Sequence, residues 1–130
     1  MKHRVLKGIP KETFLTVVHY CKQYPLWVAE LNSIADTRKA IRYDTDKVQT
    51  TPDNDSTFEA AVRISRLSEK VATIQDAAAL VADDLADWII LGACYDLPYY
   101  ALRQRGIPCG KNLYYQLRKM FYFRIAEKVG

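Results

Sequence analysis

The C-terminal residues of the chain gather basic, amide and phenolic side chains, which are the groups that proteins use to contact nucleic acid. Residues three or four positions apart share one side of a helix. On a helix predicted from about Lys111 to Lys128, one side carries Lys111, Tyr115, Arg118, Lys119 and Tyr122, with Asn112 and Gln116 at its margin. Lys and Arg neutralise phosphates or reach guanine, Asn and Gln pair with adenine, and tyrosine hydroxyls donate to phosphate oxygens. The pattern predicts a DNA-binding side, and free N–H groups at the helix N-terminus favour a phosphate there.

The two ends of this helix are expected to differ in what they contact. We expect the residues nearest the base edges to be Lys111, Asn112, Tyr115 and Gln116, and those toward phosphates to be Arg118, Lys119 and Tyr122. Arg103 and Arg105, on a short preceding helix, would support phosphate binding without specificity. An amphipathic terminal helix with a solvated polar face is the alternative interpretation.

The other side of the same helix is expected to pack against the rest of the protein. Its apolar members are Leu113, Leu117, Met120, Phe121 and Ile125. Tyr114 and Tyr115 are adjacent, so only one of them can face outward on a helix. Because Tyr114 lines up with Leu117 and Phe121, we expect Tyr115 to be the outward one.

Charge is distributed unevenly along the chain, whose formal net charge is +4. Residues 1–52 hold nine Lys or Arg and five Asp or Glu, residues 53–96 hold three and nine, and residues 97–130 hold seven and one. The three segments thus carry about +4, −6 and +6. A basic segment with interleaved aromatic residues favours a phosphate-binding surface, whereas the acidic segment suits a solvated face or a basic partner.

The residues that could carry catalysis do not form a recognisable constellation. Cys109 precedes a helix N-terminus, where a thiolate is stabilised, but His3 and His19 lie in the other half of the chain. The three cysteines, Cys21, Cys94 and Cys109, are odd in number and lack CxxC spacing, so we expect reduced thiols and no zinc site. We expect no enzyme activity and no cofactor.

Two other sequence features that can mark a ligand site have simpler explanations. Asp83, Asp84 and Asp87 could form a metal cluster, but two of them precede an apolar helix and fit capping better. The GxxxxGK pattern of a phosphate loop does not occur, because Gly106 and Gly110 are four apart. We therefore expect no metal site.

Length and composition describe a globular protein. The 130 residues are 49% hydrophobic and 26% charged, with five Gly and five Pro, which excludes a collagen-like, disordered or disulfide-scaffold chain. One domain, or a small domain with a helical arm, fits this length. The apolar runs are short and Met1–Pro10 lacks the apolar core of a signal peptide. We expect a cytoplasmic protein that does not enter a membrane.

The segment before the basic helix has the outline of a helix-turn-helix. Pro98 can begin a short helix that ends near Arg105, and Gly106 is placed just past its end. Ile107 follows as the apolar turn residue, and the longer basic helix comes next. The spacing departs from the common template, because Ile107 lies six positions before Leu113 instead of five. The turn is therefore predicted to be about one residue longer.

The first half of the chain predicts two helices and a linker. A helix begins near Pro10 and should break or bend near Tyr24, because Pro25 disfavours the α region for the residue before it. A second apolar run from Leu26 to Ile41 fades into residues 44–55, which are polar and hold turn formers. We place the boundary there, with Asp55 or Ser56 capping the next helix.

A long apolar stripe follows the linker. Its residues, spaced alternately by four and three, are Ala60, Ile64, Leu67, Val71, Ile74, Ala78, Val81, Leu85 and Trp88. A heptad stripe requires a partner helix, either from the same chain or from a second subunit. Asp83 and Asp84 can cap a new helix, so a break there is also expected.

The C-terminal sequence resembles a known group of regulators. The run RGIPCGKNLYYQLRKMFYFRIAEK, preceded by YDLPYYALRQ, is similar to GIPCGRxxFYxxRRKFFxxL, which closes phage and prophage transcriptional regulators of the RinA and ArpU type from Gram-positive bacteria. A weaker likeness begins at DSTFEAAVRISRLSEKVATI, so the resemblance covers about the last 75 residues. It implies a sigma-like helix-turn-helix that acts on phage or mobile-element promoters.

Together these patterns predict an all-α protein, a helical bundle or long-helix arm followed by a C-terminal helix-turn-helix. The predicted division is an arm at residues 1–43, a linker at 44–55, and a helical domain at 56–130 whose residues 97–130 form the helix-turn-helix. The predicted function is a sequence-specific transcriptional regulator that binds double-stranded DNA, with RNA polymerase as a candidate further partner and homodimerisation through the Ile64–Trp88 helix as an alternative to intramolecular packing. An oligomeric phage assembly or interaction module, similar to a small terminase subunit, is the competing function.

Overall fold

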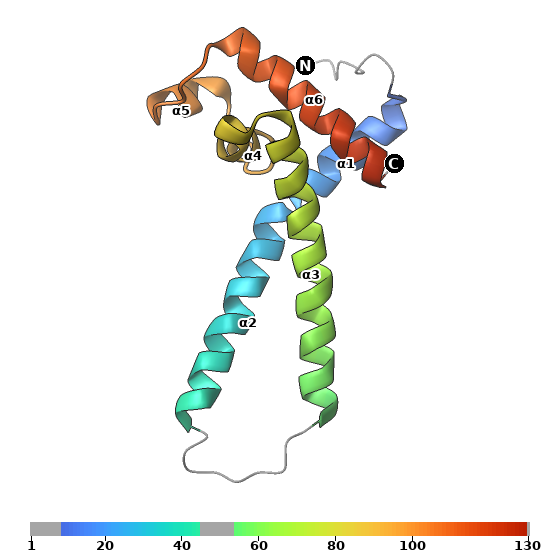
Figure 1. Cartoon of the computed structure of the whole chain (residues 1–130), viewed down its shortest axis with the longest axis vertical. Coiled ribbons are helices and arrows are strands. Elements are labelled where there is room, and N and C mark those ends of the chain that lie inside the picture. Colours follow the sequence, from blue (N-terminus) through green and yellow to red (C-terminus); the bar gives the residue numbers. More distant parts are fainter. Residues whose placement is uncertain (1–8, 45–53, 130) are drawn as a thin grey trace.

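The computed structural model describes residues 9–44 and 54–129, and this part of the chain is all-helical, which confirms the predicted all-α class (Figure 1). The helices are α1 (Lys11–Lys22), α2 (Tyr24–Asp44), α3 (Asn54–Val81), the 3₁₀ turn η1 (Asp83–Leu85), α4 (Ala86–Ala93), α5 (Tyr99–Gln104) and α6 (Lys111–Val129). The centre of the predicted 44–55 linker lies outside the described residues. None of the described helices combines the length and the apolar composition that a bilayer span requires.

The break between the first two helices occurs where proline predicts it. Pro10 precedes α1 with φ −58°, and the backbone N–H of Phe14 donates to its carbonyl at 2.9 Å. Gln23 separates α1 from α2, and its carbonyl accepts from both Leu26 and Trp27. Pro25 has no N–H to donate, so the first turn of α2 is where its ring is tolerated.

Polar residues mark both ends of the long helix α3. It begins at Asn54, one residue before the predicted cap at Asp55 and two before Ser56, a difference within the usual uncertainty of helix ends. At its other end Ala82 adopts an extended conformation, with φ −161° and ψ 103°, and Asp83 starts η1. The predicted break is therefore present, and the stripe from Ala60 to Trp88 is divided among α3, η1 and α4.

α2 and α3 form an antiparallel arm that projects from the body of the molecule, and the two helices diverge toward its free end (Figure 1). The polar contacts that join them are the ion pair of Glu30 with Arg63, the stacking of Lys70 on Trp27, and the hydrogen bond of Gln75 to Tyr24. The Arg63–Glu30 pair is exposed, so it contributes about 1 kcal/mol or less. Apolar packing at the base of the arm must therefore hold it.

The main core lies where α1, α3, α4 and α6 meet the base of α2. Its fully buried side chains include Val17, Cys21, Ile74, Ala77, Ala78, Ile89, Phe121 and Ile125. Leu67, Ile74 and Ala78 of the predicted stripe are covered by this chain's own helices, which selects the intramolecular alternative for that part of the stripe. Trp88 packs elsewhere, against a second cluster.

The second cluster lies beneath α5 and the start of α6. Leu102, Ile107 and Tyr114 are its buried members. Gly106 has φ +98°, and its N–H donates to the Arg103 carbonyl while that of Ile107 donates to the Leu102 carbonyl. These bonds form a Schellman cap with its usual apolar contact between the third-last helical residue and the residue after glycine. The predicted role of Gly106 just past the end of a helix is confirmed.

Gly92 in α4 allows α6 to approach closely. A Cβ atom added at Gly92 would overlap the Tyr114 hydroxyl and lie 3.3 Å from a Leu102 methyl group. Tyr114 is 1% exposed, and its hydroxyl has no hydrogen-bond partner among the described residues. The phenol of Tyr114 is therefore wedged against the α4 backbone.

We expect Ile74→Ala to lower the free energy of unfolding by about 2–5 kcal/mol, because Ile74 is fully buried in the main core. Leu80 lies on the same helix and is 67% exposed, so Leu80→Ala is the matched control and should change stability by less than about 0.5 kcal/mol. Urea denaturation measures both. Equal losses for the two variants would contradict the placement of the α3 core face.

We expect Gly92→Ala to destabilise the protein by about 1–3 kcal/mol, because the added methyl group collides with the Tyr114 hydroxyl. Tyr114→Phe alone should be nearly neutral, since the hydroxyl that it removes has no partner. In the Gly92→Ala background, Tyr114→Phe should recover part of the loss. Additive effects of the two substitutions, measured in a double-mutant cycle, would show that these side chains are not in contact.

Candidate nucleic-acid interface

The C-terminal half of α6 is held inside the main core. Leu117, Phe121 and Ile125 are buried there, and Phe14 of α1 makes an edge contact with the ring of Tyr122 at 5.7 Å between centroids. Before Leu117, the buried side chain of α6 is Tyr114, which belongs to the small second cluster. The first turns of α6 are therefore the part of the helix that is free to meet a partner.

The structure corrects three side-chain placements predicted for α6. Tyr122, predicted on the exposed DNA-binding side, is 9% exposed because α1 covers that side of the helix. Leu113 and Met120, predicted to pack, are 46% and 50% exposed. The buried side is centred on Tyr114, Leu117, Phe121 and Ile125, which leaves these two side chains at the solvent margin. The predicted choice between the two adjacent tyrosines is confirmed, with Tyr114 inside and Tyr115 outside.

Most of the other predicted contact residues are at the surface. The exposed ones are Arg103, Arg105, Lys111, Asn112, Tyr115, Gln116 and Lys119. Within residues 9–44 and 54–129, the ion pairs are Arg63 with Glu30 and Arg124 with Glu127, and neither uses any of these cations. Four positive charges with no carboxylate to neutralise them thus border the start of α6, while Asn112 and Gln116 supply amide groups between them. This surface can attract phosphate and offer hydrogen bonds to base edges.

Arg118 differs from the other predicted cations because it is half-buried among tyrosine rings. Its guanidinium carbon lies 4.8 Å from the centre of the Tyr115 ring, 5.7 Å from Tyr114 and 6.0 Å from Tyr122. Such cation–π contacts are each worth about 0.5–2 kcal/mol. Arg118 therefore fixes the orientation of the tyrosines as well as adding charge.

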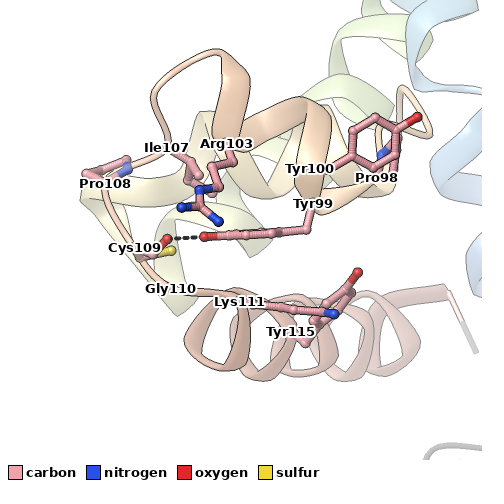
Figure 2. Close-up of a pocket in the computed structure, with 10 residues that line it drawn as sticks. All are labelled: Pro98, Tyr99, Tyr100, Arg103, Ile107, Pro108, Cys109, Gly110, Lys111 and Tyr115. Carbon is pink, nitrogen blue, oxygen red and sulfur yellow. Dashed lines mark hydrogen bonds between the residues drawn. The ribbon is translucent and has the colours of Figure 1, made fainter.

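A pocket of about 790 Å³ opens between α5 and the start of α6 (Figure 2). Its walls carry Arg103 and Lys111 together with Tyr99, Tyr100 and Tyr115. Tyr99 donates a hydrogen bond of 2.7 Å to the Cys109 carbonyl, which ties the turn to α5. Sequence reasoning missed Tyr99 and Tyr100, although two tyrosines directly after Pro98 are the signal that could have suggested an aromatic wall.

Burial raises the pKa of two tyrosine and two cysteine side chains in and around α6. Burial raises the pKa of Tyr122 and of Tyr114, and the nearby Arg118 charge opposes the rise in both. The pKa of the Cys94 thiol is raised by its contact with Cys21 and by burial. Burial also raises the pKa of Cys109, so this thiol is less ionised near neutral pH than a free cysteine.

The described residues hold no group of three His, Cys, Asp or Glu side chains that could bind a metal ion, and the three cysteines are free. The chain matches no family model, no curated protein and no solved structure. The surface around α5 and α6 is therefore the feature from which a function can be inferred.

We expect the protein to lose stability as the pH rises above about 10, because an unfolded tyrosine releases its proton there while the buried Tyr122 retains it. The stabilisation that Tyr122 contributes is fully present below the pKa of an unfolded tyrosine. It is lost as the pH rises toward the higher pKa of Tyr122 in the folded protein. Urea denaturation at pH 8 and pH 11 measures the fall, which Tyr122→Phe should reduce.

Tyr100→Phe is the matched control, since Tyr100 is 68% exposed. Its fall in stability between the two pH values should equal that of the wild type. If Tyr122→Phe also matched the wild type, the phenol of Tyr122 would be accessible to water in solution.

Proposed function

We propose that this protein is a sequence-specific DNA-binding transcriptional regulator of a phage or mobile element. In this proposal α5, the turn at residues 105–110 and α6 act as a helix-turn-helix, and α4 supports both helices from below. α6 is the recognition helix, whose first turns enter the major groove of double-stranded DNA. RNA polymerase is a proposed further partner.

The observation that carries the proposal is the exposed, uncompensated basic surface at the start of α6. Lys111, Lys119 and Arg105 are exposed, and no carboxylate among the described residues pairs with them. Asn112 and Gln116 lie between these charges on the same helix and are exposed as well. Cations give affinity for any DNA, whereas amides pair with adenine and give sequence preference.

The cap and the second cluster support the same proposal. The Schellman cap at Gly106 and the burial of Ile107 fix the path of the chain between α5 and α6. Tyr114 anchors α6 seven residues after Ile107. The common helix-turn-helix template has its apolar residue five positions after the turn residue. The resemblance of residues 105–128 to the RinA and ArpU type of regulators points in the same direction.

We expect the protein to retard a short DNA duplex at low salt and to lose affinity as salt increases. The double variant Lys111→Ala with Lys119→Ala should weaken binding to all duplexes and reduce the slope of log affinity against log salt by about two, because each phosphate contact contributes about 0.9. Replacing Lys22 and Arg66, two exposed cations outside the α5–α6 surface, by Ala is the charge-matched control. Fluorescence anisotropy measures both.

Asn112→Ala and Gln116→Ala should each cost about 1–3 kcal/mol on the preferred sequence and almost nothing on unrelated duplexes. A preferred site is first selected from a random duplex pool. If the variant without Lys111 and Lys119 and the control variant without Lys22 and Arg66 lost equal affinity for DNA, the DNA would bind outside the α5–α6 surface. An absence of any duplex binding at low salt would refute the proposed function.

The arm favours a second candidate, an oligomeric phage assembly or interaction module. Phe58 on α3 is 69% exposed, and Ile34 of α2 and Ile64 of α3 are only half-buried. Two arms from separate subunits could cover these residues in a four-helix bundle. A dimeric mass in light scattering without duplex binding would favour this candidate over the regulator, whereas a monomeric mass with duplex binding would favour the regulator.

A further inference from the structure

The pocket between α5 and α6 is lined by both aromatic rings and basic side chains, a combination that binding to a DNA duplex does not require. In Figure 2 the ring of Tyr99 lies across the pocket from Lys111 and Tyr115, and the guanidinium group of Arg103 lies near the hydroxyl end of Tyr99. Neither Arg103 nor Lys111 forms an ion pair with a carboxylate of the described residues. The pocket therefore presents flat aromatic surface and unneutralised positive charge to the same ligand.

The walls of this pocket are held in place before any ligand arrives. The Tyr99 hydroxyl is bonded to the Cys109 carbonyl, and the Tyr99 ring rests against Tyr114 at 5.7 Å between centroids. The Tyr115 ring makes an edge contact with Tyr114 at 5.1 Å between centroids, and Arg118 lies over the Tyr115 ring. Because Tyr114 is buried, both aromatic walls are braced by one fixed side chain, which reduces the entropy lost on binding.

A ligand that satisfies both features must carry a negative charge and a planar ring. A nucleotide has this chemistry, since its phosphate pairs with Arg or Lys and its base stacks on aromatic side chains. The volume of about 790 Å³ lies in the range of pockets that hold small ligands. A base inside a duplex has both faces covered by its neighbours, so it cannot lie against the tyrosines unless it is unpaired.

We propose that the pocket between α5 and α6 binds one unpaired nucleotide, with its base against Tyr99 and Tyr115 and its phosphate between Arg103 and Lys111. The nucleotide comes either from a free mononucleotide or from an unpaired position in a DNA strand. The proposal rests on the proposed function only in that both use Lys111 and Tyr115. A free nucleotide in the pocket would compete with duplex DNA for these residues.

Calorimetric titration of the full chain with AMP, adenosine and inorganic phosphate tests the pocket without any duplex present. AMP is expected to bind at least tenfold more tightly than either adenosine or phosphate, because only AMP uses both parts of the pocket. Arg103→Ala should remove most of the difference between AMP and adenosine. Tyr115→Ala should weaken AMP and adenosine alike, by about tenfold, as expected for the loss of one stacking surface.

Two further variants separate binding from folding. Tyr115→Phe keeps the ring and should bind AMP as the wild type does. Tyr95→Ala removes a tyrosine that is 42% exposed but lies outside this pocket, so it should also leave AMP binding unchanged. Binding of AMP no tighter than phosphate, or a Tyr115→Ala variant that is folded by circular dichroism and binds AMP normally, would overturn the proposal.

A single-stranded adenine hexamer with a 5′-phosphate identifies the source of the nucleotide. Tighter binding of the hexamer than of AMP assigns a nucleotide within a strand, and equal binding assigns a free nucleotide. If neither binds while the duplex is retarded, the pocket proposal fails and the proposed function stands. If AMP binds with the expected variant effects but no duplex binds, the pocket stands and the proposed function fails.

Discussion

The contact between the Tyr114 ring and the backbone at Gly92 is the constraint on which the position of α6 depends. A side chain on α4 at this point would push α6 away, and a smaller residue at position 114 would leave the second cluster without its largest member. This contact acts together with the burial of Leu117, Phe121 and Ile125 to set the roll of α6 about its axis. That roll determines that Lys111, Asn112 and Gln116 face solvent while Leu117 and Phe121 face the core.

The same tyrosine organises the aromatic groups around it. Tyr99, Tyr115 and Arg118 all rest against Tyr114, although they belong to different parts of the exposed surface. A buried ring therefore sets the geometry of side chains that are themselves accessible.

The sequence predicts local features of this fold better than the side of each helix that packs. Pro25 and Gly106 restrict their own backbone and neighbours, so the break before α2 and the cap after α5 could be predicted without knowing the rest of the structure. The burial of Tyr122 could not, because it depends on α1, which lies about a hundred residues earlier in the chain. The pocket was also beyond prediction, since it requires the turn to bring Tyr99 opposite Tyr115.

The two apolar clusters give the protein a built-in pair of optical reporters. The chain has two tryptophans, and Trp27 belongs to the main core at the base of the arm, whereas Trp88 packs against the cluster beneath α5 and α6. Their indole rings therefore sample different environments, one beside the Lys70 ammonium group and the other near Leu102 and Ile107. Fluorescence from a protein that retains only one of them can follow the arm and the α5–α6 region separately, without an attached dye.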